Sequence, residues 1–181
     1  MLAFWRFLTI LLSALALTMT SAHVLELPQK MTYTPDMYAA VNTTLYRYFA
    51  IIGGPYQIGA IVSAVVLTLL LRGRRSIFRW ALIGTVLLIA AFVSWLILVL
   101  PVNQEVAAAL DTSPETVPSL WRQLRDQWEY GHATGFALHL AGFCALVVSV
   151  VRDESRQHTV GPMRARRGAP AGAGGPGDRP D

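Results

Sequence analysis

Four stretches of apolar residues divide the chain, at positions 2–24, 49–71, 77–100 and 134–151. The third stretch contains one charged residue, Arg79, and a helix of its length reaches about 36 Å at about 1.5 Å per residue. A hydrocarbon core is about 30 Å thick, so this stretch is long enough to cross a bilayer. None of the four alternates apolar and polar residues as a strand would, so we expect four membrane-spanning helices.

The polar segments between these stretches predict further helical structure. In the first, Thr34-Pro35-Asp36 is typical of a helix start, with Thr34 as the cap and Pro35 as the first residue. The apolar residues that follow share one helical face, so we expect an amphipathic outer segment that lies across the membrane surface or leads into the second span. Residues 119–130 are also amphipathic and could extend the fourth helix out of the bilayer.

After Arg152 the chain is rich in Gly, Pro, Ala and Arg. Such a composition cannot form an apolar core, so residues 153–181 are predicted to be a disordered basic tail. The sequence therefore indicates an all-α protein: a four-helix membrane bundle over residues 1–152, followed by the tail.

Composition and charge support this interpretation. Hydrophobic residues make up 54% of the chain and charged residues only 14%, which is too little polar surface to cover a soluble globule. Of the 15 basic residues, all but Lys30, Arg47, Arg122 and Arg125 fall on the same side of the predicted spans. The positive-inside rule then places both termini in the cytoplasm, in a multi-pass protein of the cell membrane. The net charge of +4 is explained by topology, and we expect membrane lipid and no nucleic acid as a partner.

The first stretch has an alternative interpretation as a secretory signal cleaved after Ala22. Cleavage would make His23 a free N-terminus, which could bind copper through its amine and ring. The apolar character continues through Val24 and Leu25, which favours an uncleaved span. The single cysteine, Cys144, excludes an internal disulfide.

Two histidine–glutamate pairs stand at the outer ends of the first and fourth spans. His23 precedes Glu26 by three residues, and Glu129 precedes His132 by three residues. Residues three apart share a helical face. Because these two spans run antiparallel, the reversed order places the histidines at one depth and the glutamates at another. We therefore expect the four side chains to meet.

Three further polar residues extend this cluster. Asn103 closes the third span and Gln57 lies near the outer end of the second, so both could join the same layer. His139 lies two turns deeper than His132 on the same face, where an ionisable residue is expected to face the bundle interior.

The cluster is compatible with three chemistries. His23, Glu26, Glu129 and His132 could hold a single iron, manganese or zinc ion. The two histidines could instead bind haem from both sides. Without any cofactor, His132 could act as a base oriented by a glutamate.

A purely structural role for the cluster is the alternative. Helix ends near water often carry such residues, and Glu26 could pair with Lys30 as Glu129 could with Arg125. On this interpretation the tryptophans act as interface anchors, although they could also form the wall of an aromatic binding site. These residues are Trp95, Trp121 and Trp128.

The order of several short segments resembles a known family. An outer-end "AHVLELPQKM", "LYRYF" before the second span, an arginine-rich hairpin, "LPVN" after the third span and "RDQWEYGHA" before the fourth are similar to the anthrone oxygenase-like family of small four-span membrane proteins. The resemblance covers about residues 22–151. It implies a cofactor-free oxygenase that converts anthrones to anthraquinones, with His132 as the first candidate base, His23 as the second, and Asn103 as a hydrogen-bond donor to the developing oxyanion.

The leading functional hypothesis is thus an oxygenase-like enzyme that oxidises a small hydrophobic, aromatic compound at the outer leaflet. One alternative is a metal- or haem-binding redox or transport component. Another is a non-catalytic membrane subunit whose polar residues bind a partner.

Overall fold

The computed structural model describes the backbone of residues 1–167 and the side chains of residues 1–46 and 48–152. Its elements are α1 (Leu2–Lys30), α2 (Pro35–Thr44), α3 (Arg47–Leu70), α4 (Arg75–Leu98), α5 (Leu100–Thr112), a 3₁₀ turn η1 (Pro114–Thr116) and α6 (Val117–Arg167). No strand occurs in this described part, so the predicted all-α fold is confirmed.

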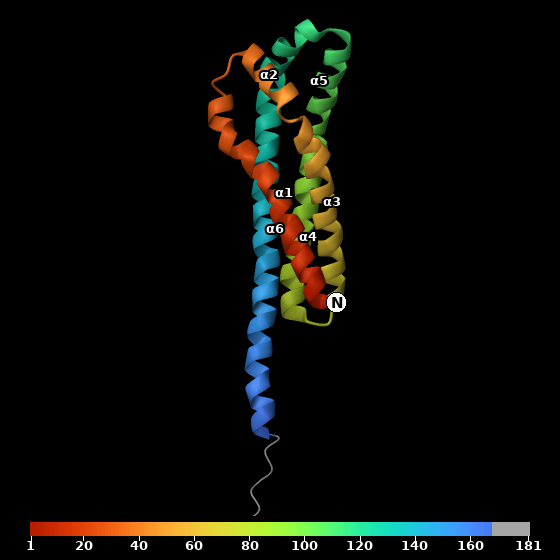
Figure 1. The fold of residues 1–181 in the computed structure, drawn as a ribbon, viewed down its shortest axis with the longest axis vertical. Helices are drawn as coiled ribbons and strands as arrows, with labels where there is room; N and C mark the ends of the chain where they lie inside the picture. Colours follow the sequence, from red (N-terminus) through yellow and green to blue (C-terminus); the bar gives the residue numbers. More distant parts are fainter. Residues whose placement is uncertain (168–181) are drawn as a thin grey trace, which may run out of the picture.

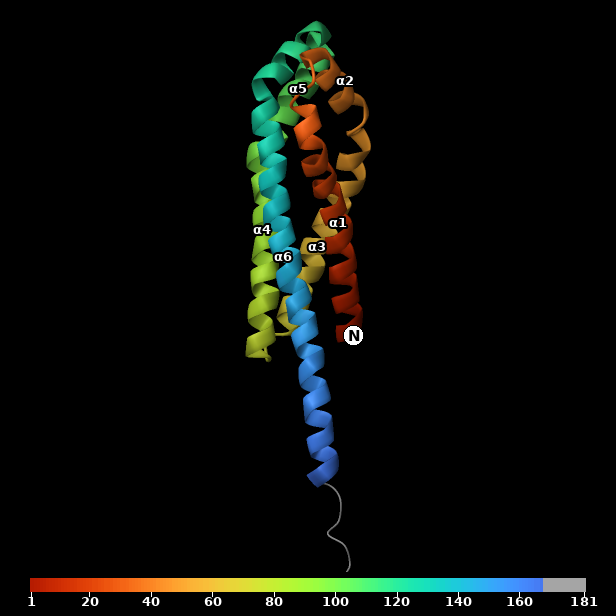
Figure 2. The same ribbon diagram turned by 90° about the vertical axis from the view of Figure 1, so that its left-hand side faces the viewer.

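Four segments are long and apolar enough to cross a membrane: Leu2–Lys30, Tyr48–Leu70, Arg75–Thr112 and Pro114–Arg152. The chain is therefore a multi-pass membrane protein. Figures 1 and 2 show the four long helices side by side. The N-terminus and the α3–α4 connection lie at one end of the bundle, whereas α2, α5 and the start of α6 cover the other, which we call the capped end (Figure 1).

Two helices extend beyond the predicted apolar stretches at the capped end. α1 continues past residue 24 to Lys30 and includes Pro28, and α6 begins at Val117, well before residue 134. The extension of α6 is the predicted amphipathic stretch, and it buries Trp121 and Trp128 against the cap. At its other end α6 runs to Arg167, so the predicted start of the tail at residue 153 falls within the helix. Residues 168–181 of that tail lie outside the described residues.

The outward faces of the long helices carry large apolar side chains, as lipid contact requires. Examples from the four spans are Phe7, Leu69, Ile97 and Leu140, all exposed. The interior also includes small residues, and α4 and α6 approach each other closely at Gly84 and Gly142. A Cβ atom on Gly84 would lie 2.6 Å from Leu146 Cγ and 2.9 Å from the Gly142 carbonyl oxygen. Close packing through glycine is a common way for helices to associate in lipid.

Helix α2 forms as its sequence predicts. The Thr34 side chain accepts a hydrogen bond from the Met37 backbone N–H at 3.4 Å, and Pro35 is the first helical residue. The helix packs against α6 at the capped end and buries Tyr38 almost completely. It therefore closes the bundle and brings a polar aromatic side chain over the ends of α1 and α6.

Candidate functional site

The structure brings His23 of α1 and His132 of α6 together beneath the cap. Their imidazole rings stack with centroids 3.9 Å apart and an interplanar angle of 20°. His23 is 5% exposed and His132 is 9% exposed. The two helices run in opposite directions (Figure 1), which is why histidines at reversed positions in their pairs reach the same depth.

Aromatic rings enclose the imidazole pair. The centroid of the Trp128 ring lies 4.3 Å from that of His132 and 5.1 Å from that of His23. The planes of the Trp128 and His23 rings are nearly perpendicular. The ring centroids of Tyr46 and Phe49 also lie close to that of His23, at 4.7 and 5.2 Å. The histidines are therefore held in a low-polarity environment, which favours the uncharged imidazole form.

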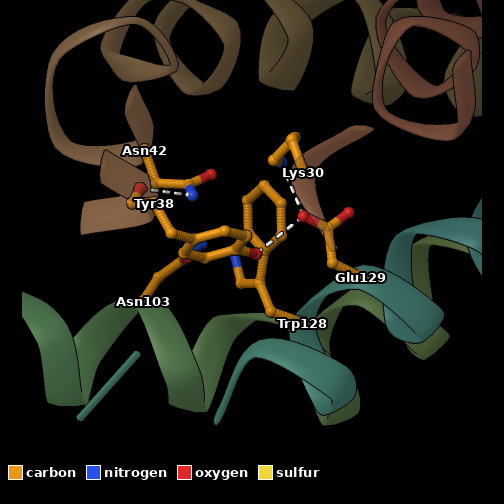
Figure 3. Close-up of polar contacts among 6 residues, drawn as sticks. All are labelled: Lys30, Tyr38, Asn42, Asn103, Trp128 and Glu129. Atoms are coloured by element: carbon orange, nitrogen blue, oxygen red, sulfur yellow. Dashed lines mark hydrogen bonds and ion pairs between the residues drawn. The ribbon is translucent and has the colours of Figure 1, made fainter. Parts of the chain in front are cut away.

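A buried ion pair lies next to this cluster (Figure 3). Lys30 Nζ, at the end of α1, is 2.7 Å from Glu129 Oε1, and the side chains are 2% and 0% exposed. The Tyr38 hydroxyl donates a 2.6 Å hydrogen bond to the same oxygen. Burial, together with the neighbouring Glu129, raises the pKa of Tyr38 above its ordinary value, so this phenol stays protonated.

Lys30 also links the ion pair to the histidines. Its Nζ lies 4.2 Å from the centroid of the Trp128 ring and 4.5 Å from that of Tyr46. A desolvated ammonium over an indole face is stabilised by the ring quadrupole. Because Trp128 contacts His132 at the same time, the position of the indole depends on both Lys30 and the imidazole pair.

These contacts correct two of the sequence expectations. Glu129 is engaged by Lys30 and Tyr38 and does not pair with Arg125, whose Nη1 donates instead to the Tyr33 carbonyl oxygen at 3.3 Å. Lys30 forms its ion pair with Glu129 rather than with Glu26, whose Oε2 is buried without a hydrogen-bond partner.

As a result, the predicted four-residue ligand set of His23, Glu26, Glu129 and His132 is not assembled. No three His, Cys, Asp or Glu side chains within the described residues form a group that could hold a metal ion. The stacked rings also differ from haem ligation, in which two imidazoles point edge-on at the iron from opposite faces.

Asn103 joins the site from α5. Its Oδ1 accepts a 2.8 Å hydrogen bond from Trp128 Nε1. This bond fixes the orientation of the amide and leaves Nδ2 as the Asn103 atom that can donate to a bound molecule. Trp128 thus connects the asparagine, the lysine and the imidazole pair.

A cavity of about 450 Å³ opens at the capped end, with His23, His132 and Asn103 in its wall. Its remaining surface is mainly apolar and aromatic, and Gly53 and Gly54 line the α3 side. Pockets of this size and character are typical of small-molecule sites. The geometry therefore provides one apolar chamber with an imidazole pair and an amide at its wall.

Other predicted residues also reach this cavity. Gln57 lines it and donates from Nε2 to the Leu88 carbonyl oxygen at 3.3 Å. His139 lines its deep end, fully buried, with Nε2 3.1 Å from the Ser13 carbonyl oxygen. The cavity wall further includes the three tryptophans predicted as anchors or as an aromatic wall, Trp95, Trp121 and Trp128.

Sequence reasoning missed the roles of Lys30 and Tyr38. Lys30 lies seven residues after His23 and four after Glu26, so helical spacing already placed it on the same face. Tyr38 gave no such signal, because its contact with Glu129 depends on α2 folding back over the bundle.

No protein-family model, curated protein or solved structure matches this chain. Evidence for the function therefore comes from the membrane architecture and the geometry of the site.

Proposed function

We propose that the protein is a membrane oxygenase that acts on a small, flat, hydrophobic aromatic compound, similar to the anthrone oxygenase-like family. The observation that carries this proposal is the stacked His23–His132 pair in the wall of an otherwise apolar cavity. An apolar chamber favours a flat hydrocarbon framework, and an uncharged imidazole in its wall supplies a base.

The proposed reaction begins with transfer of a proton from an activated CH₂ group of the substrate to His132. The resulting carbanion reduces O₂ and forms a carbon-bound hydroperoxide. Loss of the second C–H proton and cleavage of the O–O bond then release water and leave a carbonyl group. One O₂ thus converts CH₂ to C=O and H₂O without another redox partner.

The surrounding residues assist this sequence in distinct ways. His23 stacks on His132 and disperses the positive charge that the base acquires. The Asn103 Nδ2 group donates to the developing oxyanion, while Trp128 Nε1 donates to Oδ1 of the same amide and fixes its orientation. His132 is the first candidate base because it is the more exposed of the two histidines.

The proposal includes an orientation in the cell membrane. With both termini cytoplasmic, most basic residues lie inside, and the cavity faces the outer leaflet. A hydrophobic substrate would then enter from lipid and need not cross the bilayer.

The test uses the full chain in lipid nanodiscs with 9-anthrone as the probe, following anthraquinone absorbance and O₂ uptake. We expect His132→Ala to lower turnover by about 10²-fold or more, as loss of a general base does. Gly54→Leu should also abolish turnover. A Cβ atom at Gly54 meets no atom within 4 Å and the residue lines the cavity, so leucine would fill the substrate space.

Gly73→Leu is the matched control, since a Cβ atom there also meets nothing within 4 Å but the residue lies outside the cavity. It should keep wild-type turnover. Absence of anthrone oxidation by the wild-type chain, or unchanged turnover in His132→Ala, would contradict the proposed reaction.

A further inference from the structure

A second hollow, of about 460 Å³, lies between α4 and α6 at the end of the bundle opposite the cap. Its wall consists of Arg75, Ser76, Arg79, Trp80 and Ile83 from α4, with Arg152 from α6. Figure 2 shows the first turns of α4 beside α6 in this region. The hollow is separate from the histidine cavity and shares no residue with it.

The α4 side of this hollow changes from charged to apolar along one face. Arg75, Arg79 and Ile83 are spaced four residues apart and therefore lie one above the other. Ile83 is 46% exposed, and Val86, the next residue on this face, is 54% exposed. A guanidinium region at the end of the bundle thus continues directly into a lipid-exposed apolar strip.

Arg152 completes the charged region from the opposite helix. The carbon Cζ of its guanidinium lies 5.0 Å from the centroid of the Trp80 ring, so a cation–π contact holds it at the hollow. Arginine is well suited to phosphate, because its planar fork can donate two parallel hydrogen bonds. The wall contains three arginines and no carboxylate, so its charge complements an anion.

We propose that this hollow is a binding site for an anionic phospholipid. The phosphate group lies among Arg75, Arg79 and Arg152, and an acyl chain follows Ile83 and Val86 into the bilayer. The apolar strip favours a lipid over free phosphate, since phosphate alone would leave the exposed side chains of Ile83 and Val86 uncovered. Basic pockets between membrane helices are known sites for acidic head groups. The proposal does not depend on the oxygenase reaction.

Native mass spectrometry of the full chain in detergent micelles tests this site, with phosphatidylglycerol and phosphatidylcholine titrated separately. We expect wild-type protein to prefer phosphatidylglycerol. Arg79→Gln should weaken its binding by about fivefold, the effect of one basic residue near an anionic head group. The triple variant Arg75→Gln/Arg79→Gln/Arg152→Gln should lose the preference.

Arg72→Gln is the matched control. Arg72 is an exposed arginine of the same end that does not line the hollow, so this variant should bind phosphatidylglycerol as the wild type does. An equal loss in Arg72→Gln would show a diffuse charge effect and overturn the proposal. Equal binding of the two lipids by wild-type protein, or displacement of phosphatidylglycerol by millimolar inorganic phosphate, would also overturn it.

Discussion

Two pairs of glycines show how one bundle can be closely packed in one place and open in another. Between α4 and α6, a Cβ atom on Gly84 would lie 2.6 Å from Leu146 Cγ, and one on Gly142 would lie 3.1 Å from the Gly84 carbonyl oxygen. On α3, a Cβ atom on Gly53 would lie 3.4 Å from Met19 Cγ, while one on Gly54 would meet nothing within 4 Å. The first pair brings two backbones together, whereas the second leaves volume for the cavity.

The two regions are also stabilised differently. The α4–α6 seam depends on the fit of small apolar groups. The capped end instead contains a buried ammonium, a buried carboxylate and an amide bonded to an indole. Buried charges are costly unless they are paired, so loss of a charge partner should lower the stability of the capped end. Added side-chain volume should instead lower the stability of the α4–α6 seam.

The largest expected effect is at the capped end. Lys30→Met removes the cationic partner of Glu129, which is 0% exposed, and leaves the carboxylate with the Tyr38 hydrogen bond. Breaking a buried pair in this way costs about 3–5 kcal/mol, which unfolding in mixed micelles by titration with a denaturing detergent would measure. The double variant Lys30→Met/Glu129→Leu is the control and should recover much of the loss. A double variant as unstable as the single one would show that charge pairing is not the cause.

The next largest loss of stability is expected where α4 and α6 pack together. Gly84→Ala places a methyl group against Leu146 and the Gly142 backbone, and overpacking of this kind costs about 1–3 kcal/mol. Gly54→Ala, the matched change on α3, should leave the free energy of unfolding unchanged or raise it by up to about 1 kcal/mol, because alanine is the better helix former. Thermal unfolding of both variants in nanodiscs gives the measurement. Equal destabilisation would remove the distinction between the two glycine pairs.

A smaller effect is expected from the indole bond. Trp128→Phe keeps an aromatic ring beside the histidines but removes the Nε1–H that donates to Asn103. The loss should be about 1 kcal/mol, the typical net contribution of one hydrogen bond. Trp95→Phe is the control from the same cavity wall. If Trp128→Phe is no less stable than Trp95→Phe, the bond to Asn103 does not contribute to the stability of the capped end.

The last effect is a change in the pH dependence of stability, which appears only at alkaline pH. The raised pKa of Tyr38 means that its contribution to stability is complete below the unfolded-state pKa of about 10 and is lost as pH rises above it. Tyr38→Phe should therefore show a shallower decline in stability above pH ~10 than the wild type. Tyr130→Phe, a change at a residue that is 58% exposed, should decline as the wild type does. Parallel curves of stability against pH for the wild type and both variants would contradict a raised pKa of Tyr38.

The membrane bundle could be predicted from sequence because lipid permits few alternatives. Apolar stretches of span length must satisfy their own backbone hydrogen bonds, so they form helices. The meeting of His23 and His132 could also be anticipated, since antiparallel helices bring reversed pairs to the same depth. The partner of Glu129 could not, because it depends on where α1 ends and on the return of α2 over the cap. The cavity itself depends on how α3 packs against its neighbours, which helical periodicity does not specify.

The contacts of Trp128 make this residue an internal optical reporter. Its indole lies 4.2 Å from an ammonium nitrogen and 4.3 Å from the imidazole of His132, and it lines the cavity. Indole emission responds to nearby charge and to quenching by adjacent rings, so arrival of a molecule or a proton at the histidines should change its intensity and wavelength. A variant that retains Trp128 as its only tryptophan would therefore signal occupancy of the chamber without any added dye.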